Sequence, residues 1–160
     1  MATNSELYAL LRQDFLSFVQ KVFATLNPST PYLHNWHVEA IVALLDEAME
    51  GRTRRVMINV PPRTLKSMIV SIAWPAFLLG HNPALKIFVV SHGLDLAEEH
   101  HAGFRKVIES DWYRAAFPTM VPAAEKDTAL VFRTSRGGQR KAFSVDGHIT
   151  GLNRPGFAGG

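Results

Sequence analysis

Hydrophobic residues recur at helical spacing through the first part of the chain. Behind a capping-box pattern at residues 3–6, they predict one amphipathic helix of about five turns over residues 7–26. Its apolar face consists of Leu7, Leu10, Leu11, Phe15, Phe18, Val22 and Leu26. The proline-containing segment 27–31 ends the helix, so residues 1–30 are expected to form an N-terminal helix and linker. We expect this helix to pack on the body of the protein, and a lid or partner-binding helix is the alternative.

The pattern between residues 32 and 91 predicts a second helix followed by a βαβ unit. Residues 32–51 form an amphipathic helix whose buried face holds Val38, Ile41, Val42, Leu45 and Met49. Residues 55–60 are rich in β-branched side chains and stop at two prolines, as a strand would. Residues 66–79 are apolar nearly all round, which is typical of a crossover helix pressed on a sheet, and residues 86–91 predict a buried strand. The two strands should be parallel, with a right-handed crossover.

The remainder of the chain predicts two more helices and a hairpin. A helix after residue 91 carries Leu94, Ala97, Phe104, Val107 and Ile108 on its apolar face. A short aromatic helix around residues 112–117 is expected to pack in the core rather than to stack on bases. Strands at 129–132 and 141–145 are joined across a glycine-containing turn at 136–138. Alternating strands and helices place the chain in the α/β class.

Composition indicates one ordinary globular domain. The chain has 160 residues, of which 47% are hydrophobic and 19% charged, and its net charge is +3. It has no cysteine, which excludes disulfides and thiolate metal sites. No apolar run reaches the ~18 residues of a membrane span, and no secretion signal is indicated, so we expect a cytoplasmic protein without a membrane partner. A basic excess near the C-terminus could face phosphates or be a solvated rim; it comprises Arg133, Arg136, Arg140, Lys141 and Arg154 against Asp146.

The loop that follows the first predicted strand carries the chemistry of a phosphate-binding loop. A strand, a loop ending in Lys66 and Ser67, and a helix put backbone amides, an ammonium group and a hydroxyl around one anion. The general pattern has glycine six positions and one position before the lysine, where this chain has Val60 and Leu65. Leucine at 65 carries a steric penalty if the loop needs a positive φ there. An ordinary strand-to-helix turn is therefore the alternative.

A wider set of motifs resembles the ATPase domain of the large terminase subunit of tailed bacteriophages. The motifs, in order, are Val-Met-Ile-Asn-Val-Pro-Pro-Arg-Thr-Leu-Lys-Ser at 56–67, Trp-Pro-Ala-Phe-Leu-Leu-Gly-His-Asn-Pro at 74–83, Ile-Phe-Val-Val-Ser-His-Gly-Leu-Asp-Leu-Ala at 87–97, Trp-Tyr at 112–113, Phe-Pro at 117–118 and Gly-His-Ile-Thr-Gly at 147–151. The resemblance therefore covers a partial ATPase domain at 31–151, followed by a divergent glycine-rich tail at 152–160. In the family the loop usually reads Pro-Pro-Arg-x-Gly-Lys-Ser, so Leu65 is a departure.

The resemblance implies an incomplete P-loop NTPase-like fold of the helicase and terminase type, a three-layer sandwich with a mainly parallel sheet and N-terminal helices. It also implies an ATP- and Mg²⁺-dependent motor that packages double-stranded DNA, together with a small terminase subunit and a portal, in the bacterial host cytoplasm.

The resemblance also implies roles for individual residues. Lys66 would hold the β- and γ-phosphates, Ser67 the magnesium, and Arg63 would act as a finger on the transferred phosphoryl group. The other loop positions in the nucleotide site are Pro62, Thr64 and Leu65. Trp36 or His37 would contact adenine, and a core position is the alternative for Trp36. Ser91 and Asp95 would link the nucleotide site to DNA, and capping of the following helix is the alternative for Asp95.

The acidic half of the family's active site has no counterpart here. No Asp or Glu follows Asp146, whereas phosphoryl transfer needs a metal-holding acid and a group that orients water. We therefore expect a truncated copy with impaired hydrolysis and no nuclease part. The alternatives are a non-catalytic nucleotide- or DNA-binding remnant, and a structural or interaction fragment without a ligand. An incomplete sheet also predicts low stability or self-association.

Overall fold

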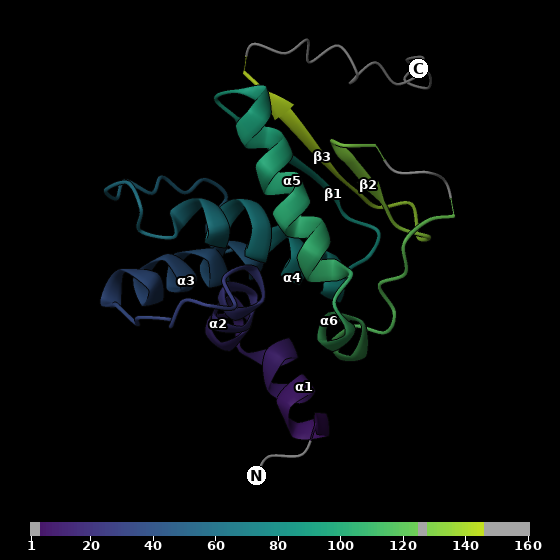
Figure 1. Cartoon of the computed structure of the whole chain (residues 1–160), viewed down its shortest axis with the longest axis horizontal. Coiled ribbons are helices and arrows are strands. Elements are labelled where there is room, and N and C mark those ends of the chain that lie inside the picture. The colour runs from purple at the N-terminus through teal and green to yellow at the C-terminus, as the bar shows by residue number, and fades with distance from the viewer. Residues whose placement is uncertain (1–3, 125–127, 146–160) are drawn as a thin grey trace.

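The protein has a mixed α/β fold with a three-stranded sheet. A computed structural model describes residues 4–124 and 128–145. The helices in these ranges are α1 (Asn4–Gln13), α2 (Phe15–Leu26), α3 (Trp36–Met49), α4 (Trp74–His81), α5 (Leu94–Ile108) and α6 (Asp111–Ala116), with a π-helical segment η1 (Met68–Ala73) directly before α4. The strands are β1 (Lys86–Ser91), β2 (Val131–Arg133) and β3 (Gln139–Ser144) (Figure 1). None of the helices in the described ranges is long and apolar enough to cross a membrane.

The predicted single helix over 7–26 is wrong, because the chain breaks into α1 and α2 at Asp14. Asp14 has an extended backbone (φ −114°, ψ 107°), and its carboxylate accepts a hydrogen bond from the Ser17 amide at 2.7 Å. Such a side chain competes with the helical backbone and begins a new helix. The expected packing on the body is confirmed, since Phe18 and Val19 are fully buried. Thr3 of the capping-box pattern lies outside the described residues.

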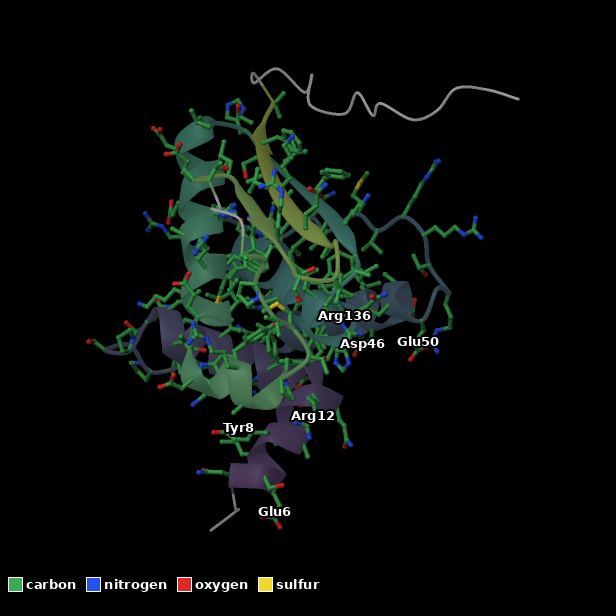
Figure 2. All side chains as sticks on the ribbon, turned by 90° about the vertical axis from the view of Figure 1, so that its right-hand side faces the viewer. Glu6, Tyr8, Arg12, Asp46, Glu50 and Arg136 are labelled. Atoms are coloured by element: carbon green, nitrogen blue, oxygen red, sulfur yellow. The ribbon has the colours of Figure 1, made fainter. Side chains whose placement is uncertain are left out.

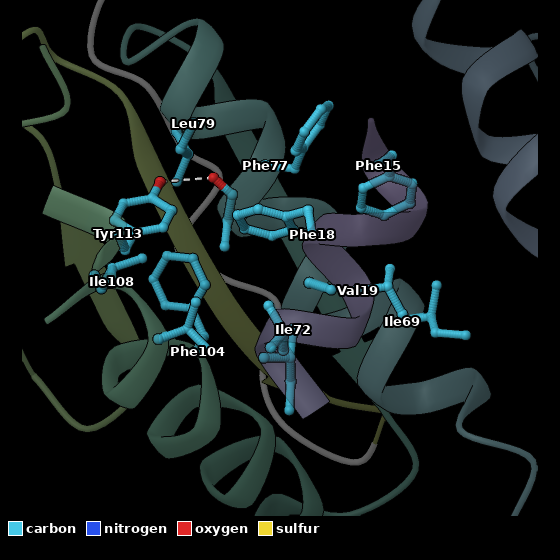
Figure 3. Packing of buried hydrophobic residues seen from close by; sticks show 14 of the residues in the cluster. Phe15, Phe18, Val19, Ile69, Ile72, Phe77, Leu79, Phe104, Ile108 and Tyr113 are labelled. Carbon is cyan, nitrogen blue, oxygen red and sulfur yellow. Dashed lines mark hydrogen bonds between the residues drawn. The ribbon is translucent and has the colours of Figure 1, made fainter. Parts of the chain in front are cut away.

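The core joins the N-terminal helices to α4, α5 and α6 (Figure 3). The Phe18 ring meets Phe77 edge-on at a centroid distance of 5.2 Å, and Trp112 at 5.6 Å. The Tyr113 hydroxyl donates to the Ala76 carbonyl at 2.7 Å, and burial raises the pKa of this hydroxyl. The aromatic helix predicted around residues 112–117 is thus a core element, as expected.

Polar side chains of α1 and α3 lie near the C-terminal end of α4. The guanidinium of Arg12 donates to the Ala116 carbonyl of α6 at 3.0 Å. Arg12, Asp46 and Glu50, which are labelled in Figure 2, line one pocket together with Phe77 and His81. Burial, and then the neighbouring charges of Asp14 and Glu50, raise the pKa of Asp46.

The sheet is mixed, with the strand order β1-β3-β2. β1 pairs with β3 in parallel, and β2 pairs with β3 antiparallel, so the expectation of a mainly parallel sheet is corrected. The predicted strand 86–91 is confirmed, but only one of its faces is buried. The predicted hairpin is also confirmed, with its strands at 131–133 and 139–144 and with Gly137 in its turn at φ 79°.

Only one face of the sheet is covered by helix within the described residues. On the covered face, which α5 contacts, Val89 and Ala142 are buried. On the opposite face Phe88 is 46% exposed and Val90 is 55% exposed. The described part of the chain therefore forms two layers at the sheet, where a three-layer sandwich was expected.

Residues 55–60 do not form the predicted strand. They have no strand pairing in the described structure, where β1 pairs only with β3. Their exposure still alternates: Met57 is 84% exposed, while Val56, Ile58 and Val60 are half-buried. A strand needs a hydrogen-bonding neighbour, and apolar alternation alone does not supply one. The predicted βαβ unit is therefore reduced to its helix and its second strand.

The helix after the loop is not α-helical throughout. In η1 the Trp74 amide donates to the Ile69 carbonyl, five residues earlier. Pro75 has no N–H for the carbonyl of Ser71, four residues earlier, and that oxygen instead accepts a hydrogen bond from the guanidinium of Arg140 at 2.8 Å. The helix predicted over 66–79 is thus present, but with a π-helical turn before its proline and an end at His81.

Candidate anion-binding loop

The loop between residues 61 and 67 has the backbone conformation that glycine usually supplies. Arg63 has φ 64° and Leu65 has φ 63°, both in the left-handed region. For a residue with a Cβ atom this conformation costs about 1–2 kcal/mol. The structure therefore places at Leu65 the conformation for which the general phosphate-loop pattern uses glycine.

Three hydrogen bonds hold this conformation. The Thr64 hydroxyl donates to the Pro61 carbonyl at 2.7 Å. His37 Nε2 lies 3.1 Å from the Thr64 carbonyl oxygen and donates to it as the Nε2–H tautomer. The Ile69 amide donates to the Leu65 carbonyl at 2.9 Å and so begins the helix. The loop is thus tied to itself, to α3 and to the helix that follows.

Residues 61–68 line a pocket with a volume of about 530 Å³. Arg63 and Ser67 are exposed and Lys66 is half-buried, so a cationic group and a hydroxyl are available at its surface. The amides that precede the Ile69 bond belong to the first helical turn, where N–H groups have no partner within the helix and favour an anion. The loop residues singled out in the sequence, Pro62 to Ser67, are therefore brought together around one concave surface.

The two aromatic candidates before α3 differ. His37 contacts the loop through its bond to Thr64. Trp36 is 75% exposed, so the alternative of a core position is wrong for it. Its ring lies edge-on to His37 at 6.4 Å between centroids. A contact of Trp36 or His37 with adenine stays a prediction.

A second pocket, of about 540 Å³, lies on the other side of the same loop residues. It shares Leu65, Ser67 and Met68 with the loop pocket, and is closed by Phe23 and Leu26 of α2 and by α5. α5 contributes three polar groups to it: a carboxylate from Glu99, an imidazole from His100 and an ammonium from Lys106. These three residues were not predicted as site residues, because no motif in the sequence connects them with the loop.

The end of β1 connects to this second pocket. The Ser91 hydroxyl lies 3.3 Å from Nδ1 of His100, and both residues are buried. Burial lowers the pKa of His100. Asp95 does not cap α5, since Gly93 occupies the N-cap position without a side-chain bond, and the expectation of a cap is corrected. Asp95 lies in the first turn, where the helix dipole favours a carboxylate.

A buried arginine behind the loop helix was also not predicted. Arg140 is fully buried over the Phe104 ring, so for this residue neither a phosphate-facing surface position nor a solvated rim holds. Its Nη1 donates to Nδ1 of His101 at 2.8 Å, and its Nη2 donates to Ser71 in η1. Burial lowers the pKa of Arg140 to about 10. Burial, followed by the charges of Arg140 and Arg105, lowers the pKa of His101 to about 4. The alternation along β3 gives no signal for this placement, because the large apolar side chain of Phe143 lies on the opposite face from Arg140 and Ala142.

Metal ligands are sparse around the loop. In the ranges 4–124 and 128–145, no group of three or more His, Asp or Glu side chains is arranged to hold a metal ion. The motif Gly147–Gly151 and the tail at 152–160 lie outside the described residues.

Comparison of the chain with protein families, with curated proteins and with solved structures finds no match. The chemistry of the loop therefore has to follow from its own geometry.

Proposed function

We propose that the loop at residues 61–67 binds the phosphates of a nucleoside triphosphate. The observation that carries the proposal is the left-handed backbone at Leu65, directly before Lys66 and Ser67 at the start of a helix. A helix N-terminus presents free amides to an anion, and the left-handed residue before it lets the backbone approach the anion closely. Exposed surface with a lysine, a hydroxyl and an arginine completes the anion site.

The resemblance to terminases suggests ATP with Mg²⁺ as the ligand. In that assignment Lys66 holds the outer phosphates, Ser67 contributes its hydroxyl to the metal, and Arg63 reaches the terminal phosphoryl group. The donors fit the phosphates, and the exposed Ser67 hydroxyl is an oxygen ligand of the kind that Mg²⁺ would take. The metal would supply charge neutralisation at the phosphates.

Binding with little hydrolysis is the activity that the described residues support. The residues that line the loop pocket include no acid. Glu99 lines the second pocket together with Ser67. Within the terminase resemblance, the chain would act in a DNA-packaging ATPase, with double-stranded DNA, a small terminase subunit and a portal as partners of the family. The open face around Phe88 and Val90 is the surface that self-association would use.

Titration calorimetry with Mg–ATP tests the proposal. We expect saturable binding by the wild-type chain, and a loss of about 10- to 100-fold in affinity for Lys66→Ala, because a charge-assisted phosphate contact is removed. Lys86→Ala is the matched control: Lys86 is exposed at the start of β1 and lines neither pocket beside the loop. Equal affinities for the two variants, or no binding by the wild-type chain at millimolar ATP, would contradict the proposal. Phosphate release measured on the same samples separates binding from turnover.

A further inference from the structure

A side chain of α3 helps to hold the backbone conformation of the loop. We infer that His37 is a positioning residue: its hydrogen bond to the Thr64 carbonyl keeps Leu65 in the left-handed conformation that the anion site needs. The effect of this role on ligand affinity rests on the phosphate-binding function proposed above. It differs from the adenine contact that the resemblance implies for the same side chain.

The geometry of the peptide unit explains why this one bond has such leverage. The Thr64 carbonyl belongs to the peptide plane directly before Leu65, and φ of Leu65 is the rotation that orients this plane. His37 Nε2 holds the oxygen of the plane at 3.1 Å. No peptide bond in the described residues is cis, so the Leu65 amide points away from the oxygen that His37 binds. A bond on one edge of the plane therefore restrains both φ of Leu65 and the direction of its N–H.

α3 is a rigid support for this bond. His37 is the second residue of the helix, and the next residue, Val38, is 1% exposed in the core. Ile41, one turn further on, is buried in the same cluster. Because the helix is anchored through these side chains, the imidazole is held in place without a large loss of entropy on contact with the loop.

The Leu65 side chain provides the other anchor. It is half-buried against the hydrophobic core and lines both pockets beside the loop. The burial of this side chain offsets part of the strain in the Leu65 backbone. A glycine at this position would not have this strain. The Thr64 hydroxyl closes the arrangement by its bond to Pro61. Leucine thus works at this position only while α3 and the core hold it.

A double-mutant cycle tests the inference. The variants are His37→Ala, Leu65→Gly and the double variant, and the probes are Mg–ATP and inorganic tripolyphosphate. Loss of the bond lowers the fraction of loops in the binding-competent shape, and the apparent affinity falls by the same factor. We expect His37→Ala to lower the affinity for both ligands by about tenfold in the protein that has leucine at position 65. We expect a loss of less than about threefold in the Leu65→Gly background, because glycine adopts the conformation unaided.

Two outcomes of the cycle would overturn the inference. A loss that affects ATP but not tripolyphosphate would assign His37 to the base. An equal loss in both backgrounds would show that His37 does not act through Leu65. His34→Ala is the matched control, since His34 lies on the same segment and bonds to Glu39 at 2.8 Å instead of to the loop. Melting curves confirm that each variant is folded.

Amide hydrogen exchange on the ligand-free proteins separates this inference from the proposed function. We expect His37→Ala to accelerate amide exchange at residues 64–68 by about tenfold or more in the leucine protein. In the Leu65→Gly background, we expect the same substitution to leave the exchange rates at these amides unchanged. If neither ligand binds the wild-type chain but exchange accelerates in this way, the proposed function fails and the positioning role stands. Unchanged exchange at these amides in His37→Ala would overturn the positioning role whatever the ligands do.

Discussion

Two turns of the chain adopt left-handed backbone in different ways. In the hairpin turn at 134–138, Gly137 takes φ 79°, and a Cβ atom there would meet open space. In the loop at 61–67, Leu65 takes φ 63° although its side chain is half-buried. The hairpin turn is closed by local bonds around Gly137, whose amide donates to the Thr134 carbonyl at 3.1 Å, while the Gly138 amide donates to the Thr134 hydroxyl at 2.9 Å. At Leu65, the bond from His37 of α3 and the contact with the core come in addition to the local bond of Thr64.

The difference shows when a glycine can be replaced. The hairpin turn needs only the reversal of direction, and Arg136 at its tip is exposed. The loop needs the same backbone angle at Leu65, but the Leu65 side chain also lines two pockets. An L-residue can therefore take a left-handed angle where tertiary contacts over-determine it. The predictions below run from the largest expected effect to the smallest.

The largest effect is expected for Gly138→Ala, next to the turn. A Cβ atom at this position would lie 2.7 Å from the Leu85 carbonyl oxygen and closer still to that of Pro83. Both are backbone atoms, so the approach of β3 to the segment 83–85 would have to open. We expect a loss of about 3 kcal/mol or more in the free energy of unfolding, measured by urea denaturation. A loss below 1 kcal/mol would show that the two backbones are not in close contact.

Acid is expected to weaken the link between the two regions. Arg140, on β3 after the hairpin turn, bonds to Ser71 in η1 behind the loop and to His101. The folded-state pKa of His101, about 4, lies below its unfolded value of 6.5, so the neutral form is the one that stabilises the fold. This contribution is complete above pH 6.5 and is lost as the pH falls towards 4, by on the order of 2 kcal/mol.

Urea denaturation as a function of pH measures this effect, with His101→Gln as the comparison. Since the pKa values of His81 and His100 are also lowered, mainly by burial, we expect the variant to flatten the acid dependence without abolishing it. An identical pH profile in the variant would show that His101 is not the titrating group.

An inverted order of alanine and glycine is expected at Leu65. Alanine would keep the left-handed strain but lose the buried part of the side chain, whereas glycine would lose the strain as well. We expect Leu65→Ala to be less stable than Leu65→Gly by about 1 kcal/mol, the reverse of the order at positions with ordinary angles. Thermal or urea denaturation of the two variants decides. Alanine being the more stable would show that φ at Leu65 is not positive in solution.

The smallest effect is expected for Gly137→Ala, which tests the hairpin turn in the same way. The added methyl group meets no atom within 4 Å, so the cost is the backbone strain alone, about 1 kcal/mol. The same denaturation measurement applies. A cost equal to that of Gly138→Ala would remove the distinction between a conformational glycine and a close-contact glycine.

The local pattern along the chain predicted most of the elements. Apolar spacing identified the helical regions before residue 50, the helix after residue 91, the strand at 86–91 and the hairpin, since helical and strand periods are properties of neighbouring residues. The phosphate-loop pattern identified Lys66 and Ser67 as a candidate anion site, and it marked Leu65 as the position where a positive φ would carry a steric penalty. The break at Asp14 was a local signal too, because a capping side chain competes with the helix at that point.

Contacts between distant residues decided what the pattern could not. Residues 55–60 have a strand pattern but no strand, because pairing depends on a neighbour elsewhere in the chain. Arg140 is buried because Ser71, His101 and Phe104 surround it, although it lies in a segment with an excess of basic residues. Leu65 and its left-handed angle show the same division. The amino-acid sequence established the residue and its steric penalty, and only the folded arrangement of α3 and the core around it provides the contacts that offset this penalty.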